Sequence, residues 1–128
     1  MMFNSMTKLT TAAAVGVAFA LSPLALAHDE QGKEGAAKEM TGEVVDMMCY
    51  VDHNAVGNKH GETCGAKCIK GGGPVGIVSD GKAYLVVGEH KPMNDELADY
   101  CGKTVTLKGK LAERGGIAML ENAEIIKK

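Results

Sequence analysis

The alternation of apolar and polar positions predicts five short strands between residues 40 and 128. The clearest alternation is in residues 103–113, where Gly109 keeps the apolar phase without a side chain and so indicates a bend or bulge. The second and third strands flank Asp80-Gly81, a dipeptide typical of a two-residue hairpin turn. The expected strands lie around residues 42–46, 75–79, 82–89, 103–113 and 117–128.

Two short helices are expected between these strands. Thr63 is a candidate cap for a helix over residues 64–70, which the run Gly-Gly-Gly-Pro at 71–74 ends. Asn94 is a candidate cap for a second helix that ends before Gly102. The element order then matches an all-β fold with short helices, a five-stranded OB-like Greek-key barrel. An open β-sandwich of the same strands is the alternative.

The first 27 residues have the pattern of a secretory signal peptide. Lys8 is the only charge before an apolar run, and Ala25-Leu26-Ala27 is typical of a cleavage site. Cleavage there predicts a protein of the periplasm or the cell exterior, with no stable membrane anchor. Residues 28–39 are polar and are expected to form a disordered leader, and residues 40–128 are expected to form the OB-like domain.

Composition excludes several function classes. The formal net charge of −2 and the shortage of aromatic residues argue against a nucleic-acid partner. The Gly-rich segment 71–76 is not followed by Gly-Lys-Ser/Thr, so no nucleotide site is expected. Cys-x-x-Cys-His is absent, so no covalently attached haem is expected.

The candidate chemistry lies in a cysteine segment, residues 47–68, between the first two strands. Cys64 and Cys68 would share one face of the predicted helix, His60 would fold back from the preceding loop, and Cys49 would arrive from the end of the first strand. Three thiolates and one imidazole make a recognised tetrahedral zinc set. The segment therefore predicts a metal site of Cys49, His60, Cys64 and Cys68, for zinc or copper.

Three further residues are possible additional metal ligands. Met48 adjoins Cys49 and offers a thioether for copper(I), although packing in a strand is the simpler interpretation. His53 is a possible substitute ligand. His28 would be the first residue after cleavage, where its amino group and imidazole together could chelate copper.

Disulfides are the main alternative, because four cysteines in an exported domain could pair instead of binding metal. Cys49 could bond to Cys64 or Cys68, and Cys101 could be a partner or a lone buried thiol. The protein would then be a stapled OB-fold module that contacts another exported protein. A thiol-redox protein is less favoured, because the chain has Cys-x-x-x-Cys in place of Cys-x-x-Cys. A metal with all four ligand positions filled by protein would be structural or carried, so enzyme activity is not expected.

Several motifs together resemble a family of small exported bacterial proteins with OB-like domains. They are Gly-Glu-Val-Val-Asp-x-x-Cys-Tyr at 42–50, His-x3-Cys-x3-Cys at 60–68 and Gly-x-Pro-x-Gly at 72–76. The resemblance extends over about residues 41–127. It implies that Cys49, His60, Cys64 and Cys68 act as a unit, and it implies no activity.

Overall fold

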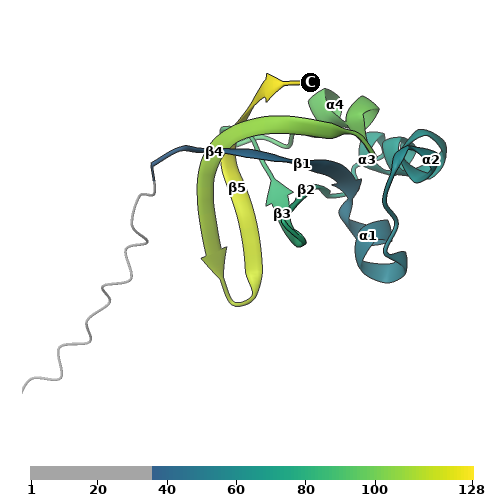
Figure 1. The fold of residues 1–128 in the computed structure, drawn as a ribbon, viewed down its shortest axis with the longest axis horizontal. Helices are drawn as coiled ribbons and strands as arrows, with labels where there is room; N and C mark the ends of the chain where they lie inside the picture. The colour runs from purple at the N-terminus through teal and green to yellow at the C-terminus, as the bar shows by residue number, and fades with distance from the viewer. Residues whose placement is uncertain (1–35) are drawn as a thin grey trace, which may run out of the picture.

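Five strands close into a barrel in the order β1-β2-β3-β5-β4 in a computed structural model that describes residues 36–128 (Figure 1). All neighbouring strands are antiparallel except β3 and β5. This arrangement confirms the predicted OB-like barrel, and its closure excludes the open sandwich. The strands are β1 (Lys38–Asp46), β2 (Val75–Ser79), β3 (Lys82–Val86), β4 (Thr104–Arg114) and β5 (Ile117–Lys127).

The turn and bulge signals of the sequence are confirmed. Asp80 and Gly81 both have positive φ, 49° and 75°, as the tight turn between β2 and β3 requires. The β4–β5 register shifts between Lys108 and Lys110, on either side of Gly109. A Cβ on Gly109 would lie only 2.7 Å from the Glu121 carbonyl oxygen, so the close approach of β5 requires glycine there.

The barrel begins slightly before the predicted domain boundary. Lys38 and Glu39, expected at the end of a disordered leader, belong to β1 and pair with Gly109 and Lys108 of β4. The predicted signal peptide and residues 28–35, with His28, lie outside the described residues. Within residues 36–128, the helices are too short or too polar to cross a membrane.

The insert between β1 and β2, residues 47–74, is more helical than expected. It holds α1 (Met47–His53), α2 (Asn58–His60), a π-helical turn η1 (Gly61–Gly65) and α3 (Ala66–Lys70). The last three are continuous, so the helix begins at Asn58 instead of Cys64. The prediction that Thr63 caps it is wrong, because the Thr63 hydroxyl donates within the helix to the Lys59 carbonyl, 2.8 Å away. The prediction also missed α1, which Asp46 caps by accepting from the Met48 N–H at 3.3 Å.

The connection from β3 to β4 holds the end of the insert in place. It contains α4 (Asn94–Leu97) and the 3₁₀ turn η2 (Ala98–Tyr100). Asn94 does not cap α4 as predicted, since Met93 is the N-cap residue. Its side-chain amide instead donates to the carbonyls of Ile69, at 2.7 Å, and Gly73, at 2.8 Å. These bonds tie the start of α4 to the C-terminal end of α3 and to the turn that follows it.

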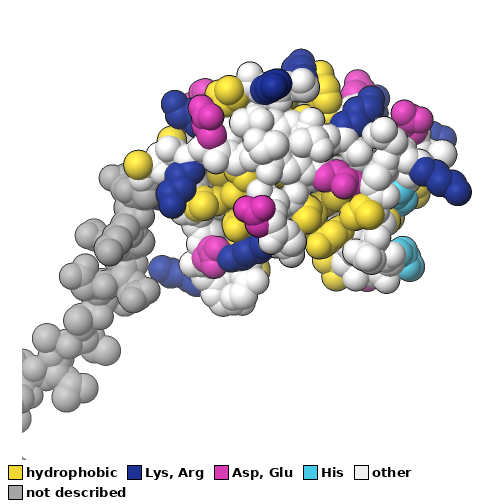
Figure 2. Space-filling view, viewed as in Figure 1, with side chains coloured by type: hydrophobic (Ala, Val, Ile, Leu, Met, Phe, Trp, Pro, Cys, Tyr) yellow, Lys and Arg dark blue, Asp and Glu magenta, His cyan; other side chains and the backbone are white. Residues whose placement is uncertain are grey.

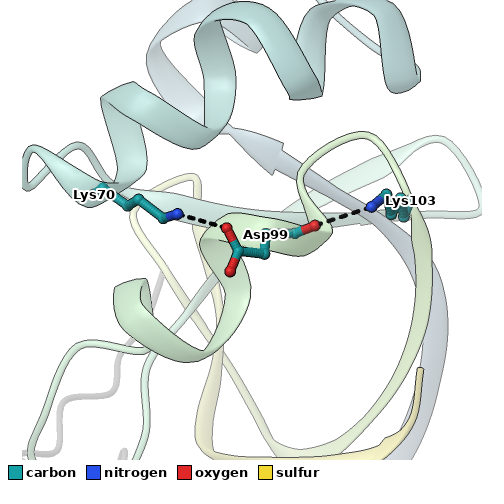
Figure 3. A network of polar contacts seen from close by, with 3 residues as sticks. All are labelled: Lys70, Asp99 and Lys103. Atoms are coloured by element: carbon teal, nitrogen blue, oxygen red, sulfur yellow. Dashed lines mark hydrogen bonds and ion pairs between the residues drawn. The ribbon is translucent and has the colours of Figure 1, made fainter.

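A surface ion pair joins the same two segments. The Lys70 ammonium lies 2.6 Å from the Asp99 carboxylate, and the Lys103 ammonium donates to the Asp99 carbonyl at 3.2 Å (Figure 3). The Lys70 ammonium lowers the pKa of Asp99. Both side chains are largely exposed, so the pair adds little to stability.

The hydrophobic core fills the barrel and extends under the helices. Residues from four strands are fully buried, namely Val44, Ile77, Leu107 and Leu120. Ile69 of α3 and Leu97 of α4 belong to the same core. The insert is therefore packed against the barrel by its last turn.

Replacing Ile77 by alanine should lower the free energy of unfolding by about 2–5 kcal/mol, because it leaves a cavity in the barrel core. Ile117→Ala is the matched control, since the Ile117 side chain is 60% exposed. The control should cost less than about 1 kcal/mol. Chemical denaturation measures both, and equal losses would contradict the assignment of the core.

Candidate metal centre

The helix of the insert lies directly on the backbone that follows η2. A Cβ on Gly61 would overlap the Cys101 carbonyl oxygen, and a Cβ on Gly65 would overlap the Cys101 sulfur. On the other side of the contact, a Cβ on Gly102 would overlap the Gly57 carbonyl oxygen. Only glycines permit this approach. The π-helical turn, a feature often found at functional sites, spans the two contacting glycines.

Five side chains of the insert and its border form what we call the donor cluster. The donor atoms of Cys49, His60 and Cys64 lie within 4.8 Å of one another, and so do those of Asp46, Cys49 and Cys68. The two groups share Cys49. The sulfurs of Cys64 and Cys68 are 3.8 Å apart, so the three thiols are also mutual neighbours. Together these groups could hold a metal ion.

The sulfur spacing suits a tetrahedral ion. Two thiolates bound to zinc at about 2.3 Å, with a tetrahedral angle between them, lie about 3.8 Å apart. The sulfurs of Cys64 and Cys68 have this separation in the protein. Little movement is therefore needed for these two side chains to share an ion when a single one is bound.

Two polar atoms of the donor cluster are buried without a hydrogen-bond partner among residues 36–128. They are Nε2 of His60 and Oδ2 of Asp46. The Asp46 side chain is almost fully buried, and its other oxygen accepts the Met48 N–H. Leaving such atoms unpaired costs free energy, so both call for an explanation. A metal ion bound through these two atoms would supply the missing partner for each.

Two thiols of the donor cluster, those of Cys49 and Cys68, are held in their protonated form in the metal-free protein. Hydrogen bonding to Asp46 raises the pKa of Cys49 to about 12, and burial and the negative charge of Asp46 act in the same direction. Hydrogen bonding to Cys64 raises the pKa of Cys68. Because metals bind the thiolate, metal binding at neutral pH must release these protons.

The four predicted ligands are brought together, but from different elements than expected. His60 lies on the helix instead of a preceding loop, and Cys49 lies on α1 instead of at the end of a strand. His60 shares a group with Cys49 and Cys64, and Cys68 shares one with Cys49 and Asp46. Positions 60 and 68 are two turns apart on the helix, and Cys49, which belongs to both groups, connects them.

Met48 and His53, the additional candidates within residues 36–128, are not part of the donor cluster. Met48 is 60% exposed, and His53, at the end of α1, is exposed and belongs to neither group. Figure 2 shows histidine side chains beside hydrophobic ones at the end of the molecule where α1 and α2 lie. Asp46 was missed as a donor because the sequence presents it as a polar residue that ends a strand.

The disulfides of the alternative hypothesis are not formed in the described structure. All four cysteines are free thiols. The 3.8 Å between the sulfurs of Cys64 and Cys68 exceeds the disulfide bond length of about 2.05 Å. Cys101 is buried in the core against Gly65, and burial raises the pKa of its thiol.

No protein-family model, curated protein or solved structure matches this chain. The resemblance to a family of exported proteins therefore stays a prediction.

Replacing Gly61 by alanine should separate the helix from the Cys101 backbone and lower the free energy of unfolding by about 1–3 kcal/mol. Glu62→Ala is the control on the neighbouring, exposed position, with an expected change within about 0.5 kcal/mol. Thermal unfolding of the reduced, metal-free variants measures both. A Gly61→Ala variant as stable as the control would show that this contact does not hold the insert.

Proposed function

We propose that this chain is an exported, non-catalytic protein that binds zinc through Cys49, His60, Cys64 and Cys68. The observation that carries the proposal is the mutual proximity of the three thiol sulfurs, with an imidazole nitrogen of His60 within 4.8 Å of two of them. Three thiolates and an imidazole are a familiar zinc set.

Zinc suits the donor cluster better than copper(I). Copper(I) prefers thiolates and thioethers, whereas zinc also accepts imidazole and carboxylate. The Asp46 carboxylate lies within the donor cluster, while the predicted thioether ligand, Met48, is exposed. Copper(I) is the second candidate because the three neighbouring thiols would bind it as well.

The position of the donor cluster favours a carried ion over one that holds the fold together. The barrel core includes neither His60 nor the thiols of Cys49, Cys64 and Cys68. Cys64 is exposed, so a donor from another molecule could reach the ion directly. When all four side chains bind a single ion, no position is left for a substrate. The partner that fits this proposal is another exported protein that delivers or accepts the ion.

Replacing His60 by glutamine should weaken zinc affinity by more than about tenfold, because it removes the nitrogen ligand from the donor cluster. His53→Gln is the matched control and should leave affinity unchanged, since His53 lies outside both groups. Competition with a chromophoric chelator, on fully reduced protein, measures both affinities. Absence of zinc binding by the reduced wild type, or two disulfides in protein isolated from its own compartment, would overturn the proposal in favour of the stapled interaction module.

Export has a separate test. Expression of the whole chain in a bacterium should give a periplasmic or secreted protein whose first residue is His28, because the signal-peptide pattern ends at Ala27. Mass spectrometry of the periplasmic fraction identifies the first residue. Full-length protein retained in the cytoplasm or the membrane would contradict export and leave the zinc proposal standing.

A further inference from the structure

The donor cluster offers more ligands than one tetrahedral ion can take. Zinc in a structural site binds four ligands, and the donor cluster contains five. We propose that it holds two zinc ions bridged by the Cys49 thiolate, with Asp46 as a ligand of the second ion. This inference rests on the proposed zinc function and extends it.

The arrangement of the donor cluster divides naturally at Cys49. With two ions bound, the first would be bound by His60, Cys64 and Cys49, and Cys68 would leave it to bind the second together with Asp46 and Cys49. Within each group every donor atom is within 4.8 Å of the others, and Cys49 is the only residue common to both. A thiolate sulfur has enough lone pairs to bind two ions at once. Each ion then keeps one position for water or for a donor of an incoming partner.

Charge balance also favours two ions. Once bound, three thiolates and the Asp46 carboxylate carry four negative charges, and one zinc ion would neutralise only half of them. Asp46 is 1% exposed, and its Oδ2 atom has no hydrogen-bond partner among residues 36–128. Lys70, on the same helical segment, is paired with Asp99 instead. A second divalent ion brings the donor cluster to neutrality, which removes the cost of burying negative charge that one ion leaves uncompensated.

The capping role of Asp46 does not account for its unpaired oxygen. The cap needs one acceptor, which Oδ1 supplies to the Met48 N–H. Asparagine caps helices as well as aspartate does. Asp46→Asn should therefore keep the start of α1 and remove the charged ligand. Asp52→Asn is the matched control, because Asp52 is an exposed residue of the same helix.

The experiment is native mass spectrometry of reduced, metal-free protein titrated with zinc alone. The wild type and Asp52→Asn should each bind two ions per chain, and Asp46→Asn should bind one. Cys68→Ser removes another ligand of the same ion and should also bind one, so a folding defect peculiar to Asp46→Asn cannot hide the result. Circular dichroism checks that each variant retains the fold.

Cadmium-113 NMR tests the bridge itself on the wild type. Two ions that share the Cys49 sulfur should give two resonances coupled to each other, whereas two separate ions would give uncoupled resonances and overturn the bridge. One zinc ion in the wild type would overturn the inference and leave the proposed function intact. Two ions in Asp46→Asn would overturn the role of Asp46. No bound zinc at all would overturn the proposed function as well.

Discussion

The close contact between the helix of the insert and the backbone at Cys101 and Gly102 is the constraint on which the donor cluster depends. Gly61 and Gly65 meet Cys101, and the Gly102 N–H donates to the Val44 carbonyl at 2.7 Å. Val44 lies on β1, two residues before Asp46, so one short segment of backbone relates the helix to the strand. The helix presents His60, Cys64 and Cys68, and β1 leads into Asp46 and Cys49. Without this contact, nothing would fix the distance between the donors on the helix and the donors at the end of β1.

The barrel and the donor cluster are held by different forces. Burial of aliphatic side chains stabilises the barrel, and the same core includes Ile69 at the end of the insert. The donor cluster lies outside this core and is positioned by glycine contacts and by the hydrogen bonds of Asn94. In classical zinc fingers, by contrast, the metal supplies the folding energy. Here the barrel can position the ligands before a metal arrives.

The sequence was informative where structure depends on local periodicity and failed where it depends on tertiary contact. The alternation in β4, the Asp80-Gly81 turn and the bulge at Gly109 are local signals, and the structure confirms each. The start of the helix at Asn58 is not a local signal, because the glycines that seemed to oppose helix formation are required by packing against Cys101.

The donor set was predictable in part for the same reason. The spacing of Cys64 and Cys68 places them on one helical face, which the sequence alone indicates. Asp46 was not predictable as a donor, because its burial results from the unexpected α1 and from Gly73, where a Cβ would lie 3.4 Å from Asp46 Oδ1. Asn94 likewise stands in a sequence typical of a cap, but its side chain donates to one carbonyl of α3 and one of the turn after it.

The two ends of the insert meet across a single pair of strands. Asp46 pairs with Val75, and the Met47 N–H donates to the Pro74 carbonyl at 2.9 Å. The insert thus leaves and re-enters the barrel at neighbouring positions, and its length can change without altering the strand register. The insert could therefore be transferred as one segment between two paired strands of another small barrel. The transferred segment would also need the Cys101–Gly102 backbone, because the helix of the insert packs on that backbone, which lies outside the insert.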